Sequence, residues 1–182
     1  MIALHIGCGK RVVSGMVNCD IQKYPDVDIV CDCTKDLPFE KGTVDLIYSC
    51  AMIEHMDRSS IDDVLKYWHS LLRVGGEIQL STDDFQAICG RYLEKKNINE
   101  LVGLLMGGSK DFTDRHGLMF DFQYLKDKME KVGFVNIERC DWGEFEPYKL
   151  DEDFDDFSRS YLPHMDFENG TLMMLNIRGF KK

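Results

Sequence analysis

The chain has 182 residues, the size of about one folded domain, and its formal net charge of −10 reflects 32 acidic against 22 basic residues. Hydrophobic residues make up 44% and charged residues 30%, a globular composition that excludes collagenous, coiled-coil and disordered chains. The acidic balance disfavours broad nucleic-acid binding, because neutralising phosphates requires clustered lysine and arginine.

Short apolar runs alternate with loops and helical patterns, which is typical of a mainly parallel sheet covered by helices. The first two runs are joined by residues 7–15 alone, too few for the usual crossover helix between parallel strands. Either that helix is reduced to a turn or the second strand is not parallel. The predicted strands are Ile2–Ile6, Met16–Asp20, Asp28–Asp32, Val44–Cys50, Glu77–Thr82, Val135–Cys140 and Leu172–Ile177.

Apolar residues spaced three and four apart predict a helix over Ile61–Val74, ended by Gly75-Gly76. A second helix is predicted over Phe122–Val132, with Asp121 as its N-cap. Residues 84–106 also have a helical pattern, and we expect this segment to cover a substrate pocket. No apolar run approaches the roughly 18 residues of a membrane span, and the N-terminus does not resemble a signal peptide, so we expect a cytoplasmic protein.

Gly7-Cys8-Gly9 directly follows the first predicted strand, where glycines allow a tight turn and a close approach of the backbone to a ligand. The dinucleotide fingerprint G-x-G-x-x-G requires a third glycine where this chain has Val12. The helix that would receive a pyrophosphate is also missing. The sequence therefore disfavours a nicotinamide- or flavin-dependent oxidoreductase.

Asp20 and Asp32 end the second and third predicted strands. A carboxylate at the tip of the second strand can accept hydrogen bonds from both hydroxyls of a ribose. An acceptor at the end of the third strand suits the amino group of adenine. Two acids at successive strand ends, after a glycine turn, favour a nucleoside ligand without phosphates.

Together these residues resemble the class I S-adenosylmethionine-dependent methyltransferases, in particular the small methyltransferase-11-like group. The likeness covers residues 2–82, continues weakly through Gly133-Phe134, and leaves out residues 85–116 and 143–170. It rests, in chain order, on Gly7-Cys8-Gly9, Asp20, Asp32, Leu37-Pro38-Phe39, Val44–Ser49, Ile53-Glu54-His55 and Leu72–Gly76.

The resemblance implies a Rossmann-like α/β fold: a seven-stranded, mostly parallel sheet with the last strand antiparallel and a shortened first helix. We expect a single methyltransferase domain over residues 1–182, whose insertions 85–116 and 143–170 shape the substrate pocket. No segment precedes the first predicted strand to cover the sheet, and an uncovered face would favour a homodimer.

The resemblance also assigns roles in binding S-adenosylmethionine. The glycine turn would lie against the methionine portion of the cofactor, and the acids and their neighbours against its adenosine. The third glycine of the family's loop is replaced by Arg11, a departure from the pattern. The expected cofactor-binding residues are Gly7, Cys8 and Gly9 for methionine, Asp20 for ribose, Ile21, Asp32 and Cys33 for adenine, and Ser49 and Cys50 near the sulfonium.

Methyl transfer needs a base when the acceptor is a hydroxyl or a protonated amine. The catalytic candidates are His55, His116 and His164, each in or beside a predicted loop. Three interpretations of Glu54-His55 stay open: an ordered loop, a base, or a divalent metal site. The last follows from a resemblance to small-RNA 3′-terminal 2′-O-methyltransferases, in which His116 matches a later ligand but Ala51 replaces a glutamate. We assign no metal ligand.

The sequence therefore predicts an S-adenosylmethionine-dependent methyltransferase that acts on an oxygen or nitrogen of a small molecule, with no nucleic-acid or membrane partner. The first alternative is a metal-assisted 2′-O-methyltransferase of RNA 3′ ends. The second is a non-catalytic nucleoside-binding or interaction module that retains the cofactor fold.

Overall fold

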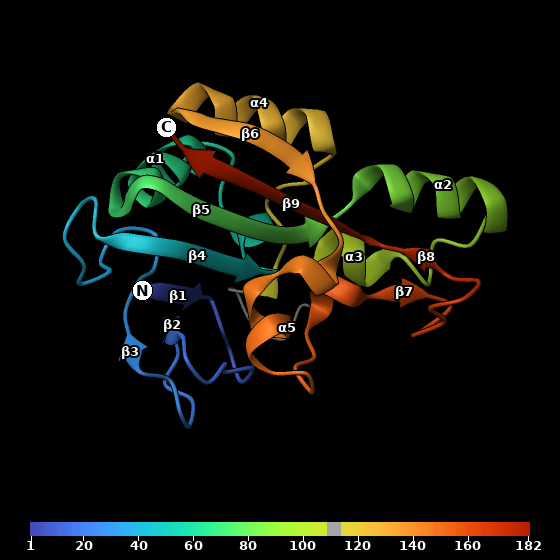
Figure 1. The fold of residues 1–182 in the computed structure, drawn as a ribbon. Helices are drawn as coiled ribbons and strands as arrows, with labels where there is room; N and C mark the ends of the chain where they lie inside the picture. Colours follow the sequence, from blue (N-terminus) through green and yellow to red (C-terminus); the bar gives the residue numbers. More distant parts are fainter. Residues whose placement is uncertain (109–113) are drawn as a thin grey trace.

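The computed structural model describes residues 1–108 and 114–182 (Figure 1). Seven strands form one sheet in the order β3-β2-β1-β4-β5-β9-β6. Strand β9 runs antiparallel to both of its neighbours, β5 and β6, whereas the other pairs are parallel, which confirms the expected sheet. The bounds are β1 Ala3–Ile6, β2 Val17–Asp20, β3 Ile29–Val30, β4 Val44–Cys50, β5 Leu72–Asp83, β6 Phe134–Arg139 and β9 Met174–Lys181.

The helices are unevenly distributed along the chain, because the connections between β1, β2, β3 and β4 have none among the described residues. A two-stranded hairpin, β7–β8, precedes β9. Short 3-10 turns are η1 Ile53–His55, η3 Trp142–Glu144 and η4 Phe157–Arg159. The helices are α1 Ile61–Leu71, α2 Phe85–Lys95, α3 Val102–Met106, α4 Phe122–Val132 and α5 Glu146–Leu150, and the hairpin strands are β7 Tyr161–Leu162 and β8 Thr171–Leu172.

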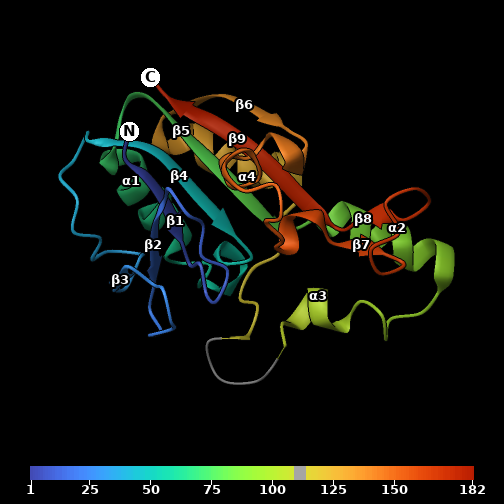
Figure 2. The same cartoon turned by 60° about the horizontal axis from the view of Figure 1, so that its bottom comes forward.

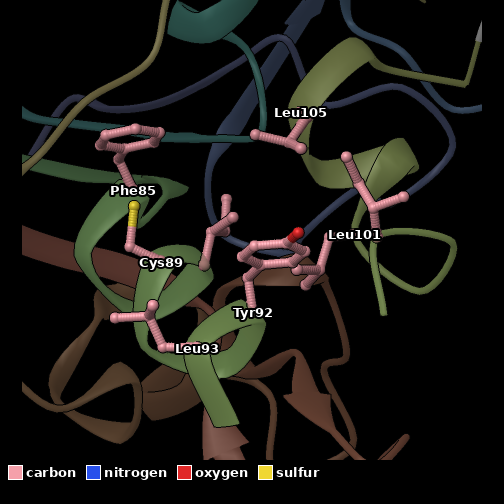
Figure 3. A pocket seen from close by; sticks show the side chains of 8 residues that line it. Phe85, Cys89, Tyr92, Leu93, Leu101 and Leu105 are labelled. Atoms are coloured by element: carbon pink, nitrogen blue, oxygen red, sulfur yellow. The ribbon is translucent and has the colours of Figure 1, made fainter. Parts of the chain in front are cut away.

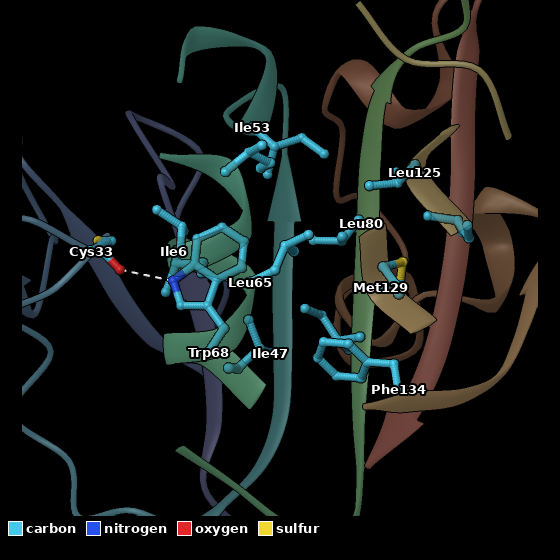
Figure 4. Packing of buried hydrophobic residues seen from close by; sticks show 14 of the residues in the cluster. Ile6, Cys33, Ile47, Ile53, Leu65, Trp68, Leu80, Leu125, Met129 and Phe134 are labelled. Carbon is cyan, nitrogen blue, oxygen red and sulfur yellow. Dashed lines mark hydrogen bonds between the residues drawn. The ribbon is translucent and has the colours of Figure 1, made fainter. Parts of the chain in front are cut away.

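Helices α1 and α4 cover one face of the sheet, and Figure 4 shows side chains of this layer. Trp68 of α1 is fully buried, and its indole Nε1 donates a hydrogen bond to the carbonyl of Cys33 at 2.8 Å. Because side chains alternate along a strand, Ile47 of β4 faces these helices while Leu46 and Tyr48 face the other side. This layer includes Ile6, Leu65, Trp68, Leu80, Leu125, Met129 and Phe134.

Strands β1 and β2 pair in parallel although no helix joins them, so the first helix is reduced to turns. The Asn18 side chain organises the connection: its Oδ1 accepts from Val13 N–H at 2.8 Å, and its Nδ2 donates to the carbonyls of Val13 and Met16 at 3.1 and 3.2 Å. Asp28 in turn accepts from the backbone N–H of Asn18 at 2.8 Å. A buried amide thus provides the hydrogen bonds that a helix would form internally.

The second face of the sheet is covered by a segment from the other end of the chain, residues 141–160, which we call the strap. Phe145 and Phe154 of the strap are buried against Ala3 of β1 and against Leu46 and Tyr48 of β4. The strap thereby fills the place that the missing first helix leaves. The homodimer expected from an uncovered face stays a prediction, and over β1 and β4 that face is not bare.

The predicted end of the first helix was wrong, because α1 stops at Leu71 rather than at Val74. Leu72 already has an extended backbone with ψ of 141° and pairs with Val44 of β4. Its carbonyl accepts a hydrogen bond from Lys181 Nζ at 2.7 Å. Strand pairing therefore overrides the helical pattern, and Gly75-Gly76 lie within β5. The second helix begins as predicted, with Asp121 accepting from Tyr124 N–H at 2.8 Å.

The predicted helical segment 84–106 contains two helices, α2 and α3, separated by residues 96–101. Residues 109–113 of the expected insertion lie outside the described residues. Helix α2 and the hairpin β7–β8 lie beyond the carboxyl end of β5 (Figure 2). In residues 1–108 and 114–182, none of the helices combines the length and apolarity needed to cross a lipid bilayer.

Candidate active site

A cavity of about 920 Å³ lies beyond the carboxyl ends of β1, β2 and β4. It brings together residues from the first strands, from η1, from α3 and from the strap. All of the predicted cofactor-binding residues except Ser49 line it: Gly7, Cys8, Gly9, Asp20, Ile21, Asp32, Cys33 and Cys50. Ser49 is buried, and its Oγ lies 3.5 Å from Met52 Sδ.

The glycine turn is fixed by hydrogen bonds to β2. The N–H groups of Gly7 and Cys8 donate to the carbonyl of Cys19 at 2.9 and 3.2 Å. Gly7 has a φ of 70°, and a Cβ atom at this position would lie 2.7 Å from Met52 Cγ. Gly9 has a φ of 56°, but a Cβ atom there would meet nothing within 4 Å. The first glycine is thus required by packing, and the second leaves open space beside the cavity.

Asp20 lies at the tip of β2, with its carboxylate held by the backbone. Its Oδ2 accepts from Gly9 N–H and its Oδ1 from Gln22 N–H, both at 2.8 Å. Each carboxylate oxygen can accept a further hydrogen bond from a ligand. Ile21 follows with 60% of its surface exposed, so it offers an apolar surface beside the carboxylate.

Asp32 follows β3 and has several partners of its own. Its Oδ1 accepts from the N–H and the hydroxyl of Thr34 at 3.0 and 2.5 Å, and its Oδ2 pairs with Lys35 Nζ at 3.0 Å. Partial burial raises the pKa of Asp32, but the contacts with Thr34 and Lys35 outweigh it and hold the pKa below its usual value. Asp32 therefore has fewer unoccupied acceptor positions than Asp20.

Four titratable side chains gather where η1, the end of β5 and the loop before α4 meet: Glu54, His55, Asp83 and His116. The imidazole centroids of His55 and His116 are 4.8 Å apart. Glu54 Oε2 accepts from the hydroxyl of Thr82 at 2.9 Å, and Asp83 Oδ2 lies 3.3 Å from His116 Nδ1. All four line the cavity, and we call them the acid–histidine cluster.

Burial alters the protonation of this cluster. It raises the pKa of Glu54, and together with the nearby Glu54 it raises the pKa of Asp83 to about 8. Burial lowers the pKa of His116 below its usual value. At neutral pH Asp83 is therefore mainly protonated, and His116 is neutral, which is the form that can accept a proton.

The hydrogen bonds of the two histidines indicate which ring nitrogen carries the proton. His116 Nδ1 lies 3.0 Å from the carbonyl of Leu104, and His55 Nδ1 lies 3.2 Å from the carbonyl of Arg115. Because a carbonyl only accepts, each Nδ1 carries the hydrogen when the ring is neutral. Each Nε2 then has the lone pair that a base needs.

The cluster also has the composition of a metal site. Ligand atoms of Glu54, His55 and His116 lie within 4.8 Å of one another. One carboxylate and two imidazoles can bind divalent transition metals. The group matches the residues of the metal interpretation that the sequence left open, with Ala51 still in place of a fourth ligand.

The third catalytic candidate, His164, is not brought to the cavity. It is exposed in the loop after β7 and is not among the residues that line the cavity. Sequence reasoning missed Asp83, which ends β5 as Asp20 ends β2. The rule that identified Asp20 would have identified Asp83 as well. It also missed Asp156 and His5, which both line the cavity.

A separate apolar groove of about 310 Å³ lies between α2 and α3. Figure 3 shows Tyr92 and Leu93 of α2 on one side and Leu101 and Leu105 on the other. Leu105 belongs to α3, whose Gly103 and Leu104 line the large cavity, so this short helix lies between the two spaces. The described residues that line this groove are aliphatic or aromatic apart from Cys89, so the lining favours an apolar ligand.

Comparison with known proteins agrees with this geometry. Residues 9–76 match the family described as a methyltransferase domain, whereas no curated protein matches the chain. An S-adenosylmethionine-dependent methyltransferase from Thermotoga maritima, described as a possible histamine N-methyltransferase, is 18% identical with a TM-score of 0.60, over 100% of this chain and 82% of that one. One from Archaeoglobus fulgidus is 16% identical with a TM-score of 0.59, over 98% and 85%.

A larger enzyme has the same fold over part of its length. Phosphoethanolamine N-methyltransferase 2 from Haemonchus contortus, solved in complex with S-adenosyl-L-methionine, is 14% identical with a TM-score of 0.52. The match covers 100% of this chain but 49% of that enzyme. At these identities the likeness establishes the fold, and it confirms the Rossmann-like arrangement expected from the sequence.

Proposed function

We propose that this chain, a class I S-adenosylmethionine-dependent methyltransferase by its fold and by the domain match over residues 9–76, methylates an oxygen or nitrogen atom of a small-molecule acceptor. The observation that carries the proposal is the single cavity. It holds the glycine turn and Asp20 at one end and the acid–histidine cluster at the other. A nucleoside site and a set of bases thus face the same space.

The residues at the first end fit the cofactor. S-adenosylmethionine supplies a methyl group on a sulfonium, which is electrophilic without help from the protein. The glycine turn presents backbone without side-chain bulk at Gly9, and Asp20 offers carboxylate oxygens to the two ribose hydroxyls. Both groups are held by hydrogen bonds before any ligand binds, so little ordering is needed on binding.

The residues at the second end can take the acceptor's proton. His116 Nε2 is the atom that we assign to this role, because Nδ1 is engaged by Leu104 and Asp83 and the ring is neutral at pH 7. His55 lies beside it and is the second candidate. Holding the acceptor between these bases and the cofactor end supplies the alignment on which methyl transfer depends.

The charge of the cavity supports a small acceptor rather than a nucleic acid. Acids line it along its whole length, whereas Lys10 and Arg11 are its lysine and arginine among the described residues. A polyanion would meet repulsion there in addition to the net charge of −10.

The test begins with calorimetric titration of S-adenosylhomocysteine, the demethylated product. We expect micromolar affinity, about −8 kcal/mol. The chain is then incubated with methyl-labelled S-adenosylmethionine and a panel of small alcohols, phenols and amines, with product and S-adenosylhomocysteine measured together. Absence of binding would refute the proposal, and binding without turnover across the panel would favour the non-catalytic module.

The composition of the acid–histidine cluster supports one second candidate, metal-assisted methylation of a ribose hydroxyl at an RNA 3′ end. In that case chelation would abolish turnover and Mn²⁺ or Mg²⁺ would restore it. Glu54→Gln would remove one ligand and raise the metal concentration needed. Unchanged turnover after chelation, with a small-molecule acceptor methylated, would exclude this candidate.

A further inference from the structure

The end of the cavity beside β1 and β4 contains an acid that neither the adenosine site nor the acid–histidine cluster uses. Asp156 belongs to the strap and lines the cavity together with His5, Cys50 and Phe157. Only 7% of Asp156 is exposed. A buried acid on the wall of a ligand cavity, supplied by a distant segment of the chain, requires an explanation.

The carboxylate of Asp156 is positioned by three donors. The hydroxyl of Tyr48 donates to Oδ2, and the hydroxyl of Tyr148 and the N–H of Ser158 donate to Oδ1 at 2.9 and 2.8 Å. A carboxylate can accept about four hydrogen bonds. Oδ2 therefore keeps capacity for a further donor from the cavity.

A second polar atom at this end has no partner in the part of the chain that the structure describes. Nδ1 of His5 is buried and forms no hydrogen bond there. His5 itself is 2% exposed and lies on the cavity wall. Burial lowers the pKa of His5 to about 4, so the ring is neutral at physiological pH. An unpartnered buried polar atom costs free energy unless a ligand satisfies it.

The topology indicates which part of a bound cofactor reaches this end. Asp20 and Asp32 follow β2 and β3, on one side of the glycine turn, whereas β1 and β4 lie on the other side. A nucleoside anchored by Asp20 that extends across the turn places its far end over β1 and β4. In S-adenosylmethionine this far end is the amino acid, which carries an ammonium and a carboxylate.

Charges of both signs are available for these two groups. Lys10 and Arg11 follow the glycine turn and line the cavity, and the Arg11 guanidinium lies 4.2 Å from the ring centroid of Phe157 on the strap. A guanidinium suits a carboxylate, and Asp156 is the acid beside it for an ammonium. The other acids of the cavity lie near the adenosine residues or around the acid–histidine cluster.

We propose that Asp156, with His5 Nδ1, binds the α-ammonium group of the methionine portion of the cofactor, so that the strap completes a cofactor site begun by the glycine turn. The inference rests on the proposed function, because it needs S-adenosylmethionine in this cavity. Under this proposal the amino group is recognised by the strap, which lies outside the residues 9–76 that match the methyltransferase family.

The experiment compares three ligands by calorimetry on the full chain. These are S-adenosylhomocysteine, its deaminated analogue, which keeps the carboxylate, and 5′-methylthioadenosine, which lacks the amino acid. Wild type is expected to bind S-adenosylhomocysteine about ten- to a hundredfold more tightly than the deaminated analogue. Asp156→Asn should remove that preference and leave the affinity for 5′-methylthioadenosine within about twofold. The matched control is Asp155→Asn, an exposed strap residue that pairs with Arg159 and should change nothing.

Several results would overturn the inference. The first is a wild-type affinity for S-adenosylhomocysteine less than about threefold higher than that for the deaminated analogue. This measurement needs no variant, so it tests the inference even if Asp156→Asn fails to fold. Equal weakening of all three ligands by Asp156→Asn would show that Asp156 only holds the strap in place. If wild type binds none of the three ligands, the proposed function fails with it. If all three bind equally, the proposed function stands and this inference falls.

Discussion

The two ends of the cavity are built on different physical principles. At the end proposed to bind adenosine, Gly9 and Gln22 hold Asp20 through backbone N–H groups, and the glycine turn is hydrogen-bonded to Cys19. At the other end, Glu54 and Asp83 are buried acids whose protonation depends on each other and on their surroundings. One end is therefore fixed in shape, and the other is variable in charge.

This contrast fits the roles that we propose for the two ends. A cofactor is the same in every reaction cycle, so a rigid site lowers the cost of binding it. A proton has to arrive and leave in every cycle, so groups with pKa values displaced toward neutrality are useful there. Substitutions at the two ends should consequently separate into effects on affinity and effects on turnover.

The largest effect is expected from His116→Gln. Loss of a positioned base should lower kcat by about 10²- to 10⁴-fold, with the affinity for S-adenosylhomocysteine unchanged within about twofold. Steady-state kinetics and calorimetry on the same preparation measure the two quantities. His164→Gln is the control and should leave kcat within about twofold, since His164 is exposed and does not line the cavity. A large loss there would restore its predicted catalytic role.

Gly7→Ala should break the rigid end. The left-handed φ of 70° disfavours a side chain, and the new Cβ would displace Met52, so we expect the free energy of unfolding to fall by about 2–3 kcal/mol and cofactor affinity to fall with it. Urea denaturation measures the first effect. In Gly9→Ala the new Cβ would meet nothing within 4 Å, so only the left-handed backbone conformation disfavours the alanine. We expect the free energy of unfolding to fall by about 1 kcal/mol. Equal losses in both variants would contradict the role of Met52.

Asp20→Asn should weaken S-adenosylhomocysteine binding by about 1–3 kcal/mol, because the ribose hydroxyls lose a charged acceptor. Asp32→Asn should cost less, since the Asp32 carboxylate is already occupied by Thr34 and Lys35. Calorimetry on the two variants ranks them. The reverse order would mean that the adenine edge, rather than the ribose, provides the main anchor.

The last prediction concerns the dependence of stability on pH. Burial and Glu54 raise the pKa of Asp83 to about 8, whereas an aspartate in an unfolded chain releases its proton near pH 4. Between these values the folded state holds a proton that the unfolded state has lost, so the free energy of unfolding should decrease as pH rises from about 4 to 8. Asp83→Asn should flatten that decrease, measured by urea denaturation at pH 5 and pH 8. Parallel curves would show that Asp83 does not titrate in this way.

The rigid end was more predictable than the variable one. Asp20 ends β2 and Asp32 lies two residues after β3, so a local pattern places both, and the glycine turn after β1 is predicted in the same way. His116 was predicted from its loop and from its match to a later metal ligand, whereas its partner Asp83 was overlooked although it also ends a strand. The place of the strap could not be predicted, because the burial of Phe145 and Phe154 depends on a sheet face that lacks its helix. Likewise, the helical pattern through Val74 could not reveal that Leu72 would pair with β4.

The strap has a consequence for the order in which the protein can be made. The strands that it covers, β1 and β4, leave the ribosome long before residues 141–160 are synthesised. Until then their second face, including Leu46 and Tyr48, lacks the packing that Phe145 and Phe154 provide. Contacts of such large sequence separation form late and slowly. The nascent chain therefore passes through a stage in which one face of the sheet is packed and the other exposes hydrophobic side chains. Chaperone binding at this stage would protect the chain from aggregation.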